Sequence, residues 1–382
     1  MSEKNAKNRI NERSMYGKSG IDIHLFVIVV LLLLLGLIAM YTSSYASAYY
    51  KYGNSYHYVI NQFAYSVIGI IAMLAISKFL SIRLLKKLTP LAYVCSIILL
   101  LLVPFIGVVR NGAKRWLEVG PISVQPSEIG KIALVLMMSL VIVNLGPKKM
   151  GTLKFGVIGM GLVMLPIVGL VLIEKHLSAT IILCLIAAVL MYVGGTRPRY
   201  FVIVICAGVA LVGIVLLVAP YTMSRVQIWF DPWKDSLGKG YQTIQSLLAI
   251  GSGGLFGVGL GQSRQKHMYI PEPQNDFIFS IWCEELGFVG ALIVILLFAL
   301  LIWRGIVIAM RAPDKFSGLV VIGLIAKLAW QVIFNIGVVT NTVPNTGISL
   351  PFFSYGGTAL ILQLCEMGII LAISKYSVIT KE

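Results

Sequence analysis

The chain has 382 residues, of which 58% are hydrophobic and only 12% are charged, whereas soluble domains carry about 25% charged residues, so an ordinary soluble fold is excluded. The net charge of +16 is dispersed over many loops instead of forming one patch, which excludes a nucleic-acid-binding protein. The five cysteines lie in apolar segments without metal-ligand spacing, so neither a zinc site nor a disulfide framework is indicated.

Repeated apolar runs of about 20 residues predict a polytopic, all-α membrane protein, because each run suits a helix crossing about 30 Å of hydrocarbon. We expect a basic tail at 1–20, one transmembrane domain at 21–375 and a short tail at 376–382. Ten spans are predicted, at about 21–43, 59–77, 88–108, 127–145, 155–173, 177–195, 200–219, 277–302, 317–340 and 353–374. Only three residues, 174–176, separate the fifth and sixth spans, which predicts a tight hairpin.

The distribution of Lys and Arg over the loops predicts the orientation. More of these cations fall in the segments on the side of the N-terminus than in the opposite loops. Since positive residues are enriched in cytoplasmic loops, both termini are expected in the cytoplasm. The long loop at 220–276, between the seventh and eighth helices, then lies on the outer face.

A charged pair opens the fourth span. Glu128 and Lys131 follow Pro126 and Ser127, which suit a helix start, and their spacing of three places them on one helix face. Charged residues within a membrane are costly and mark functional sites. Two interpretations stay open: an ion pair between helices, or the wall of a watery cavity.

The outer loop contains a glycine-rich stretch at 251–261 that leads to Asp276 at the start of the eighth span. No phosphate-binding P-loop or dinucleotide-binding pattern is present, so we expect the glycines to allow close backbone approach or a re-entrant turn. Asp276, Ser280 and Glu284 recur every four residues and predict one polar stripe, with Glu285 beside it.

The last two spans carry polar residues as well. Lys327 lies within the ninth span and Glu366 within the tenth. We expect Lys327 to pair with Glu284, Glu285 or Glu366, because an unpaired charge in the membrane is costly. Together these residues predict a polar central cavity.

The outer cations suggest an anionic lipid substrate. Arg115, Arg264 and Lys266 could bind phosphates, although each could equally contact a lipid headgroup. The outer face holds neither ATP nor nucleotide sugars, so a synthetic reaction there needs an energised group such as a polyprenyl-pyrophosphate sugar. Its transfer requires a carboxylate base, for which Asp276 is the candidate, and cations to stabilise the leaving pyrophosphate, for which Lys131 is a further candidate.

Several long motifs occur in a characteristic order, at residues 111–116 (NGAKRW), 125–131 (QPSEIGK), 231–233 (DPW), 271–279 (PEPQNDFIF), 284–287 (EELG) and 344–357 (PNTGISLPFFSYGG). In these motifs the chain resembles the SEDS family, to which RodA, FtsW and SpoVE belong. The resemblance covers about residues 20–375 and is closer to FtsW and SpoVE. The segment 174–178 (EKHLS) departs from the family, which commonly has a proline and an aspartate there. Thr358 stands where the family commonly has a serine after the double glycine.

The resemblance implies a glycosyltransferase that polymerises lipid II into peptidoglycan on the outer face of the bacterial cytoplasmic membrane, for division, elongation or sporulation. It implies Asp276 as the catalytic residue, Glu128 and Lys131 as a cavity pair, and a class B penicillin-binding protein as partner beside membrane lipids. A divalent cation, Mg²⁺ or Mn²⁺, is also implied. A lipid II flippase is the alternative, since polar stripes around a cavity suit transport too; a non-enzymatic scaffold would not need an outer carboxylate beside cations.

Overall fold

The computed structural model describes residues 20–110, 113–120, 122–203, 227–238, 240–267 and 269–377, together with residues 206, 208, 210 and 213. Within these residues, eight helices are long and apolar enough to cross a membrane. The elements are α2 (Ile23–Tyr52), α3 (His57–Phe79), α4 (Ile82–Ile106), β1 (Val108–Arg110), β2 (Ala113–Val119), β3 (Ile122–Val124), α5 (Pro126–Met150), the π-helical η1 (Lys154–Gly159), α6 (Met160–Ile173), α7 (Leu177–Val193), the 3₁₀ turn η2 (Pro232–Asp235), α10 (Tyr241–Gly253), α11 (Ile278–Met310), α12 (Lys315–Val339) and α13 (Gly357–Ser374).

Local chemistry explains where several helices begin and end. Asp22 caps α2, its carboxylate accepting a hydrogen bond from the Leu25 amide at 3.0 Å. The same helix ends at Gly53, whose positive φ of 67° suits a helix C-terminus. Pro126 occupies the first turn of α5, where its missing N–H leaves no hydrogen bond unmade. The starts of α2 and α5 lie within two residues of the predicted span limits, whereas α2 continues to Tyr52, nine residues beyond the predicted limit of 43.

The predicted spans agree with the structure where the structure describes them. The eight long helices correspond to predicted spans one to five and eight to ten, while α7, in place of the sixth, has 17 residues. The tight hairpin is confirmed, because α6 ends at Ile173 and α7 begins at Leu177. The seventh predicted span, 200–219, lies largely outside the described residues.

A small sheet corrects the expectation of an all-α chain. Strands β1, β2 and β3 form an antiparallel meander in the connection between α4 and α5. Leu117 of β2 pairs with Val124 of β3, and Val108 of β1 pairs with Trp116 of β2. β-Branched and aromatic residues beside tight turns favour strands over helix, so the local sequence is compatible with this sheet.

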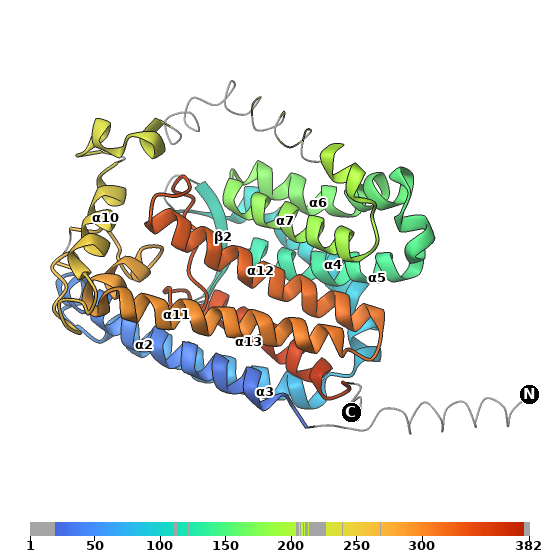
Figure 1. The fold of residues 1–382 in the computed structure, drawn as a ribbon, viewed down its shortest axis with the longest axis horizontal. Helices are drawn as coiled ribbons and strands as arrows, with labels where there is room; N and C mark the ends of the chain where they lie inside the picture. The colour runs from blue at the N-terminus through green and yellow to red at the C-terminus, as the bar shows by residue number, and fades with distance from the viewer. Residues whose placement is uncertain are drawn as a thin grey trace, which may run out of the picture.

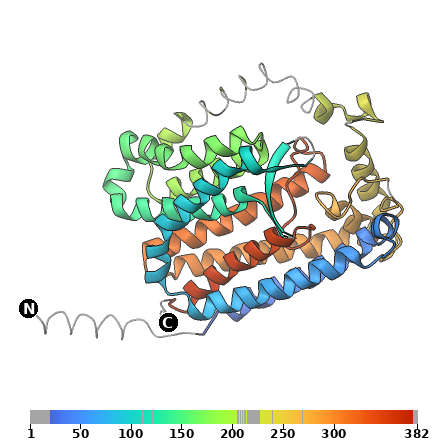
Figure 2. The ribbon, with the colours of Figure 1, turned by 180° about the vertical axis from the view of Figure 1, so that it is seen from behind.

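The helices form one elongated bundle. In Figure 1, α2, α11, α12 and α13 run roughly side by side, and α4 to α7 lie beyond α12; Figure 2 shows the same layers from behind. The described chain starts and finishes at one end of the bundle, where the Asp22 amide donates to Ser374 Oγ at 3.1 Å. The sheet and α10 lie toward the opposite end in both views, and that end contains Asp276.

A break in α11 is filled by the glycine-rich loop. At Gly287 the helix has a non-helical backbone with φ of 64°. The amides of Val258 and Gly259 donate to the carbonyls of Glu284 and Glu285, each at 3.0 Å. In return the Phe288 amide, freed by the break, donates to Gly254 O at 2.9 Å. The predicted close backbone approach is therefore confirmed, and it satisfies polar groups that the break would leave unpaired.

Candidate active site

Asp276 lies immediately before α11, at the end of a turn that begins at Pro271. Its backbone carbonyl accepts a hydrogen bond from Asn335 Nδ2 of α12 at 2.8 Å, and the same nitrogen donates to Ile348 O at 2.8 Å. Asn335 thus ties the turn to the connection between α12 and α13. The backbone of Asp276 is held in place, while its side chain stays available.

The carboxylate of Asp276 is half-buried and faces a glycine. A Cβ atom added at Gly347 would lie only 3.2 Å from Asp276 Oδ2, and Gly347 has a positive φ of 67°. Within the described chain, no hydrogen bond engages this carboxylate. Burial raises the pKa of Asp276 to about 6, and the charge of Glu272 adds to the shift. A carboxylate with a pKa close to the working pH is well suited to general base catalysis.

The segment 344–356 connects Asp276 to the start of α7. The Ser178 hydroxyl donates to the Thr346 carbonyl, next to Gly347. On the other side of the segment, the Tyr355 amide donates to Gln274 O at 2.8 Å, two residues before Asp276. The motif at 344–357 was part of the sequence resemblance, but its contacts with Asp276 and Ser178 were not predicted. The sequence feature that could have indicated these contacts is the run of small and turn-forming residues in that motif.

The start of α7 carries a second titratable cluster. His176 Nδ1 lies 3.4 Å from Ser127 Oγ, and Arg115 Nη2 donates to Lys175 O at 2.5 Å. Burial raises the pKa of Glu174 to about 8, which the charge of Arg115 only partly offsets. Burial also lowers the pKa of His176 to about 3, with Arg115 adding to the effect. At neutral pH this corner therefore presents a neutral acid, a neutral imidazole and one guanidinium.

Glu128 and Lys131 belong to a buried network of four charges. Lys131 Nζ lies 2.6 Å from Glu128 Oε1, and Lys327 Nζ lies 3.3 Å from Glu128 Oε2. Lys327 also pairs with Glu366, which confirms one of the three partners predicted for it. Two cations and two anions from α5, α12 and α13 thereby neutralise one another, so the network joins three helices without net charge.

Glu284 and Glu285 do not belong to the network around Lys327, which corrects the predicted surroundings of the polar stripe. Glu284 accepts hydrogen bonds from the Ser263 hydroxyl and from the Arg264 amide, the latter at 2.9 Å. Glu285 Oε1 lies 2.8 Å from Lys266 Nζ. The prediction that this stripe faces a cavity shared with Lys327 is wrong, because the two glutamates bind the loop after the glycine-rich stretch.

Ser280 follows the same pattern as these glutamates. Its hydroxyl lies 2.7 Å from Ser246 Oγ of α10, and Ser246 donates to Val339 O of α12 at 2.7 Å. The polar face of α11 is therefore directed at α10 and at the loop that follows it. Along this face, Asp276 is distinguished by a carboxylate with no hydrogen bond to the described part of the chain.

The three outer cations differ in their surroundings. Lys266 is fully buried, paired with Glu285 and placed 4.8 Å from the centre of the Tyr45 ring. Arg264 is exposed, three residues after Gly261. Arg115 is half-buried and reaches the turn before α7. The exposed Arg264 is thus better placed for a phosphate group than Lys266, whose charge is already matched.

The divalent cation that the resemblance implies stays a prediction. Among the residues that the structure describes, no three His, Cys, Asp or Glu side chains come together in a group that could hold a metal ion. Glu128 and Glu285 are each matched by lysines. Since Mg²⁺ is commonly held by one or two carboxylates together with substrate phosphates, a site for it does not require a group of three side chains.

Comparisons with known proteins agree with one another. The FtsW/RodA/SpoVE family, described as cell cycle protein, matches residues 23–379. The chain is 42% identical to stage V sporulation protein E of Bacillus subtilis (strain 168) over 94% of this chain and 98% of that one. It is 35% identical to a "Probable peptidoglycan glycosyltransferase FtsW" of Geobacter sp. (strain M18), over 93% and 97% of the two chains.

Two solved structures share the fold. A chain from the structure described as "Structural coordination of polymerization and crosslinking by a peptidoglycan synthase complex" superposes with a TM-score of 0.78 at 30% identity, covering 93% of this chain and 97% of that one. The rod shape determining protein RodA of Thermus thermophilus superposes with a TM-score of 0.68 at 28% identity, covering 93% and 96%.

Proposed function

The chain belongs to the FtsW/RodA/SpoVE family, and from this premise we propose that it is a peptidoglycan glycosyltransferase that polymerises lipid II into glycan strands. The observation that carries the proposal is Asp276, a half-buried carboxylate at a helix start without a hydrogen bond to the described chain. A base with these properties is what glycosyl transfer to a sugar hydroxyl requires.

The proposed reaction is an inverting transfer. Asp276 removes the proton from the acceptor hydroxyl of one lipid II molecule. The resulting oxygen forms a bond to the anomeric carbon of the growing strand, while the bond from that carbon to the pyrophosphate breaks. Undecaprenyl pyrophosphate leaves with the electron pair, and Arg115 and Arg264 are proposed to stabilise its negative charge. No step is assigned to a divalent cation.

We propose ten membrane spans with both termini in the cytoplasm. The eight long helices, the shorter α7 and the predicted span at 200–219 make up this number. In that topology the end of the bundle with Asp276, α10 and the sheet faces outward, where lipid II is exposed. The excess of Lys and Arg in the loops on the other side supports this orientation.

A transpeptidase of the penicillin-binding protein class B is the proposed partner. The structurally similar chain comes from a peptidoglycan synthase complex in which polymerisation and crosslinking are coordinated. Large apolar side chains exposed on the outer faces of the helices, such as Leu292 and Leu296 of α11, leave room for a transmembrane helix beside membrane lipids.

Purified lipid II provides the test. The protein with its partner, reconstituted in liposomes, should produce glycan strands that are resolved on a gel, and Asp276→Ala should abolish them. Vesicles that translocate lipid II without forming polymer would instead indicate a flippase. Polymer formation by Asp276→Ala at the parental rate would refute the role of Asp276.

A further inference from the structure

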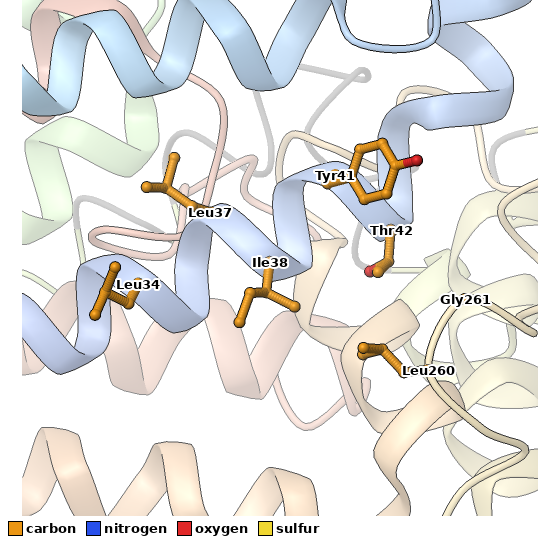
Figure 3. Close-up of a pocket in the computed structure, with 7 residues that line it drawn as sticks. All are labelled: Leu34, Leu37, Ile38, Tyr41, Thr42, Leu260 and Gly261. Atoms are coloured by element: carbon orange, nitrogen blue, oxygen red, sulfur yellow. The ribbon is translucent and has the colours of Figure 1, made fainter.

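An apolar groove of about 570 Å³ runs along the second half of α2 (Figure 3). One wall consists of Leu34, Ile38 and Thr42 of α2, and the other of Leu260 and Gly261 of the glycine-rich loop. The groove therefore lies between a helix and the loop that fills the break in α11. The lining is almost entirely hydrocarbon, which suits an aliphatic chain.

A second, more polar groove continues along the same helix. It is lined by Tyr45, Tyr49 and Tyr50 of α2 and by His267. Leu34, Ile38, Tyr41, Tyr45 and Tyr49 are spaced three or four residues apart and form one stripe, which extends over about 22 Å at 1.5 Å per residue. The two grooves thus follow one another along one face of α2, a path that is apolar at one end and aromatic at the other.

An exposed arginine lies on the loop segment between the two grooves. Gly261 of the first groove and His267 of the second flank the exposed Arg264 in the sequence. His267 Nε2 lies 3.4 Å from the Tyr45 hydroxyl, which fixes the ring over the path. Arg264 therefore lies on the loop segment that lines both grooves, and its exposed guanidinium can complement an anionic headgroup.

The end of α2 contacts the turn that carries Asp276. Lys51, close to the end of α2, forms an ion pair with Glu272 at 3.4 Å. Glu272 belongs to the turn before Asp276 and influences its carboxylate electrostatically. A lipid bound along α2 would therefore bring its headgroup toward the proposed base. Contact with an ordinary phospholipid would explain the apolar groove, but it would not explain why the aromatic groove follows it toward the turn before Asp276.

We propose that the groove along α2 binds the polyprenyl chain of the lipid-linked substrate, with its pyrophosphate beside Arg264 and His267 and its first sugar among the tyrosines. This inference rests on the proposed function and adds a subsite to it. The polyprenyl chain moves from the lipid bilayer into the groove and gains little hydrophobic free energy, because lipid tails are as apolar as the groove. Selectivity therefore comes from the headgroup and from the fit of the groove.

A photocrosslinking experiment tests the binding. The photoreactive amino acid p-benzoylphenylalanine is placed at Ile38, in the groove, or at Leu165, an exposed residue of α6 that serves as control. Both variants carry Asp276→Ala, so that binding is read without turnover, and are reconstituted with labelled lipid II in phosphatidylglycerol liposomes. We expect labelling at Ile38 that excess undecaprenyl pyrophosphate suppresses, and none at Leu165.

Three results would overturn the proposal: equal labelling at both positions, labelling that the competitor leaves unchanged, or crosslinking of Ile38 to phospholipid or to a partner's transmembrane helix instead of lipid II. Because Asp276→Ala is used throughout, these outcomes are independent of whether Asp276 is the base.

A kinetic experiment tests the consequence for the reaction. Ile38→Trp and Leu260→Trp fill the groove and should each raise the KM for lipid II about tenfold, with kcat changed less than twofold; Leu165→Trp should change neither. An unchanged KM in both groove variants would refute the subsite. Failure of the unmodified protein to polymerise lipid II would refute the proposed function instead.

Discussion

Asp276 combines a fixed backbone with an unengaged carboxylate. Asn335 holds its carbonyl, and Gly347 lets the backbone of the 344–356 segment approach its oxygen without a side chain between them. The carboxylates of the four-charge network and of Glu284 and Glu285 are matched by lysines or by loop amides, whereas the buried Glu174 also lacks a hydrogen bond. A general base must be ionised, so Asp276, with a pKa of about 6, suits this role better than Glu174, with a pKa of about 8.

Polymerisation should depend on the protonation of Asp276. The base acts as the carboxylate, so kcat/KM should rise as the pH increases through about 6. Asp276→Asn should lower the rate by about 10² to 10⁴ and remove this limb of the profile. The measurement is the initial rate of lipid II polymerisation between about pH 5 and about pH 8, a range that includes the pKa of Asp276.

Glu272→Gln is the matched variant for this profile. The charge of Glu272 helps to raise the pKa of Asp276, so its removal should move the midpoint to lower pH and leave the plateau in place. A midpoint that stays where it is in both Glu272→Gln and Asp276→Asn would show that another group titrates.

The buried Glu174 makes stability depend on pH. The pKa of Glu174 is about 8 in the folded chain, whereas its ordinary value is 4.5. Between these two pH values, the folded chain keeps a proton on Glu174 that the unfolded chain has lost. Stability from this group is thus present at low pH and declines as the pH rises. Glu174→Gln should raise the Tm at pH 8 and have little effect at pH 4.5.

Thermal unfolding in detergent, followed by intrinsic fluorescence, measures this difference. A Tm gain for Glu174→Gln that is the same at both pH values would contradict the assignment.

At the scale of elements, α11 and the glycine-rich loop depend on each other. The helix break at Gly287 frees backbone groups that the loop then satisfies, and Glu284 and Glu285 hold the residues that follow the loop. This arrangement requires glycine where two backbones meet. A Cβ atom at Gly257 would lie 2.1 Å from Glu285 O, and one at Gly253 would lie 2.1 Å from Cys283 O.

Gly257→Ala should therefore destabilise the fold. Its positive φ of 80° and the contact with Glu285 O both oppose a side chain, and strained backbone of this kind costs about 1–3 kcal/mol. The free energy of unfolding should fall by at least that amount. Gly251→Ala in α10, where nothing lies within 4 Å of the added Cβ, should be neutral or stabilising. Equal Tm values for the two variants would argue against the backbone contact.

At the scale of the whole molecule, the four-charge network joins helices that are distant in sequence. Lys131 and Glu128 come from α5, Lys327 from α12 and Glu366 from α13, and all four are largely buried. Removing one member of such a network leaves an uncompensated charge, whereas neutral pairs of similar volume are tolerated.

Lys327→Met should destabilise the protein by about 3–5 kcal/mol. Adding Glu366→Gln removes the charge that is left without its partner, so the double variant should recover part of this loss. A double-mutant cycle on the denaturant unfolding free energies measures the coupling. Additive effects of the two substitutions would show that Lys327 and Glu366 do not interact.

Much of this organisation could be predicted from local patterns. Apolar runs located the helices, three-residue spacing placed Glu128 beside Lys131, and the position of Asp276 after a proline-rich turn placed it at a helix start. The short sheet was missed because strands of three and seven residues carry little periodic signal beside long apolar runs. The polar stripe of α11 was misread because spacing indicates a shared face but not what covers that face.

The sequence by itself determined the membrane class, the family and the residue that acts as candidate base, because these follow from composition, helical period and long motifs. Only the tertiary structure decided which charges are already matched, that the 344–356 segment reaches both Asp276 and Ser178, and that α2 and the glycine-rich loop form a groove. The physical reason is that these contacts join residues far apart in the chain. Whether a costly polar group is satisfied depends on such neighbours, and local spacing does not specify them.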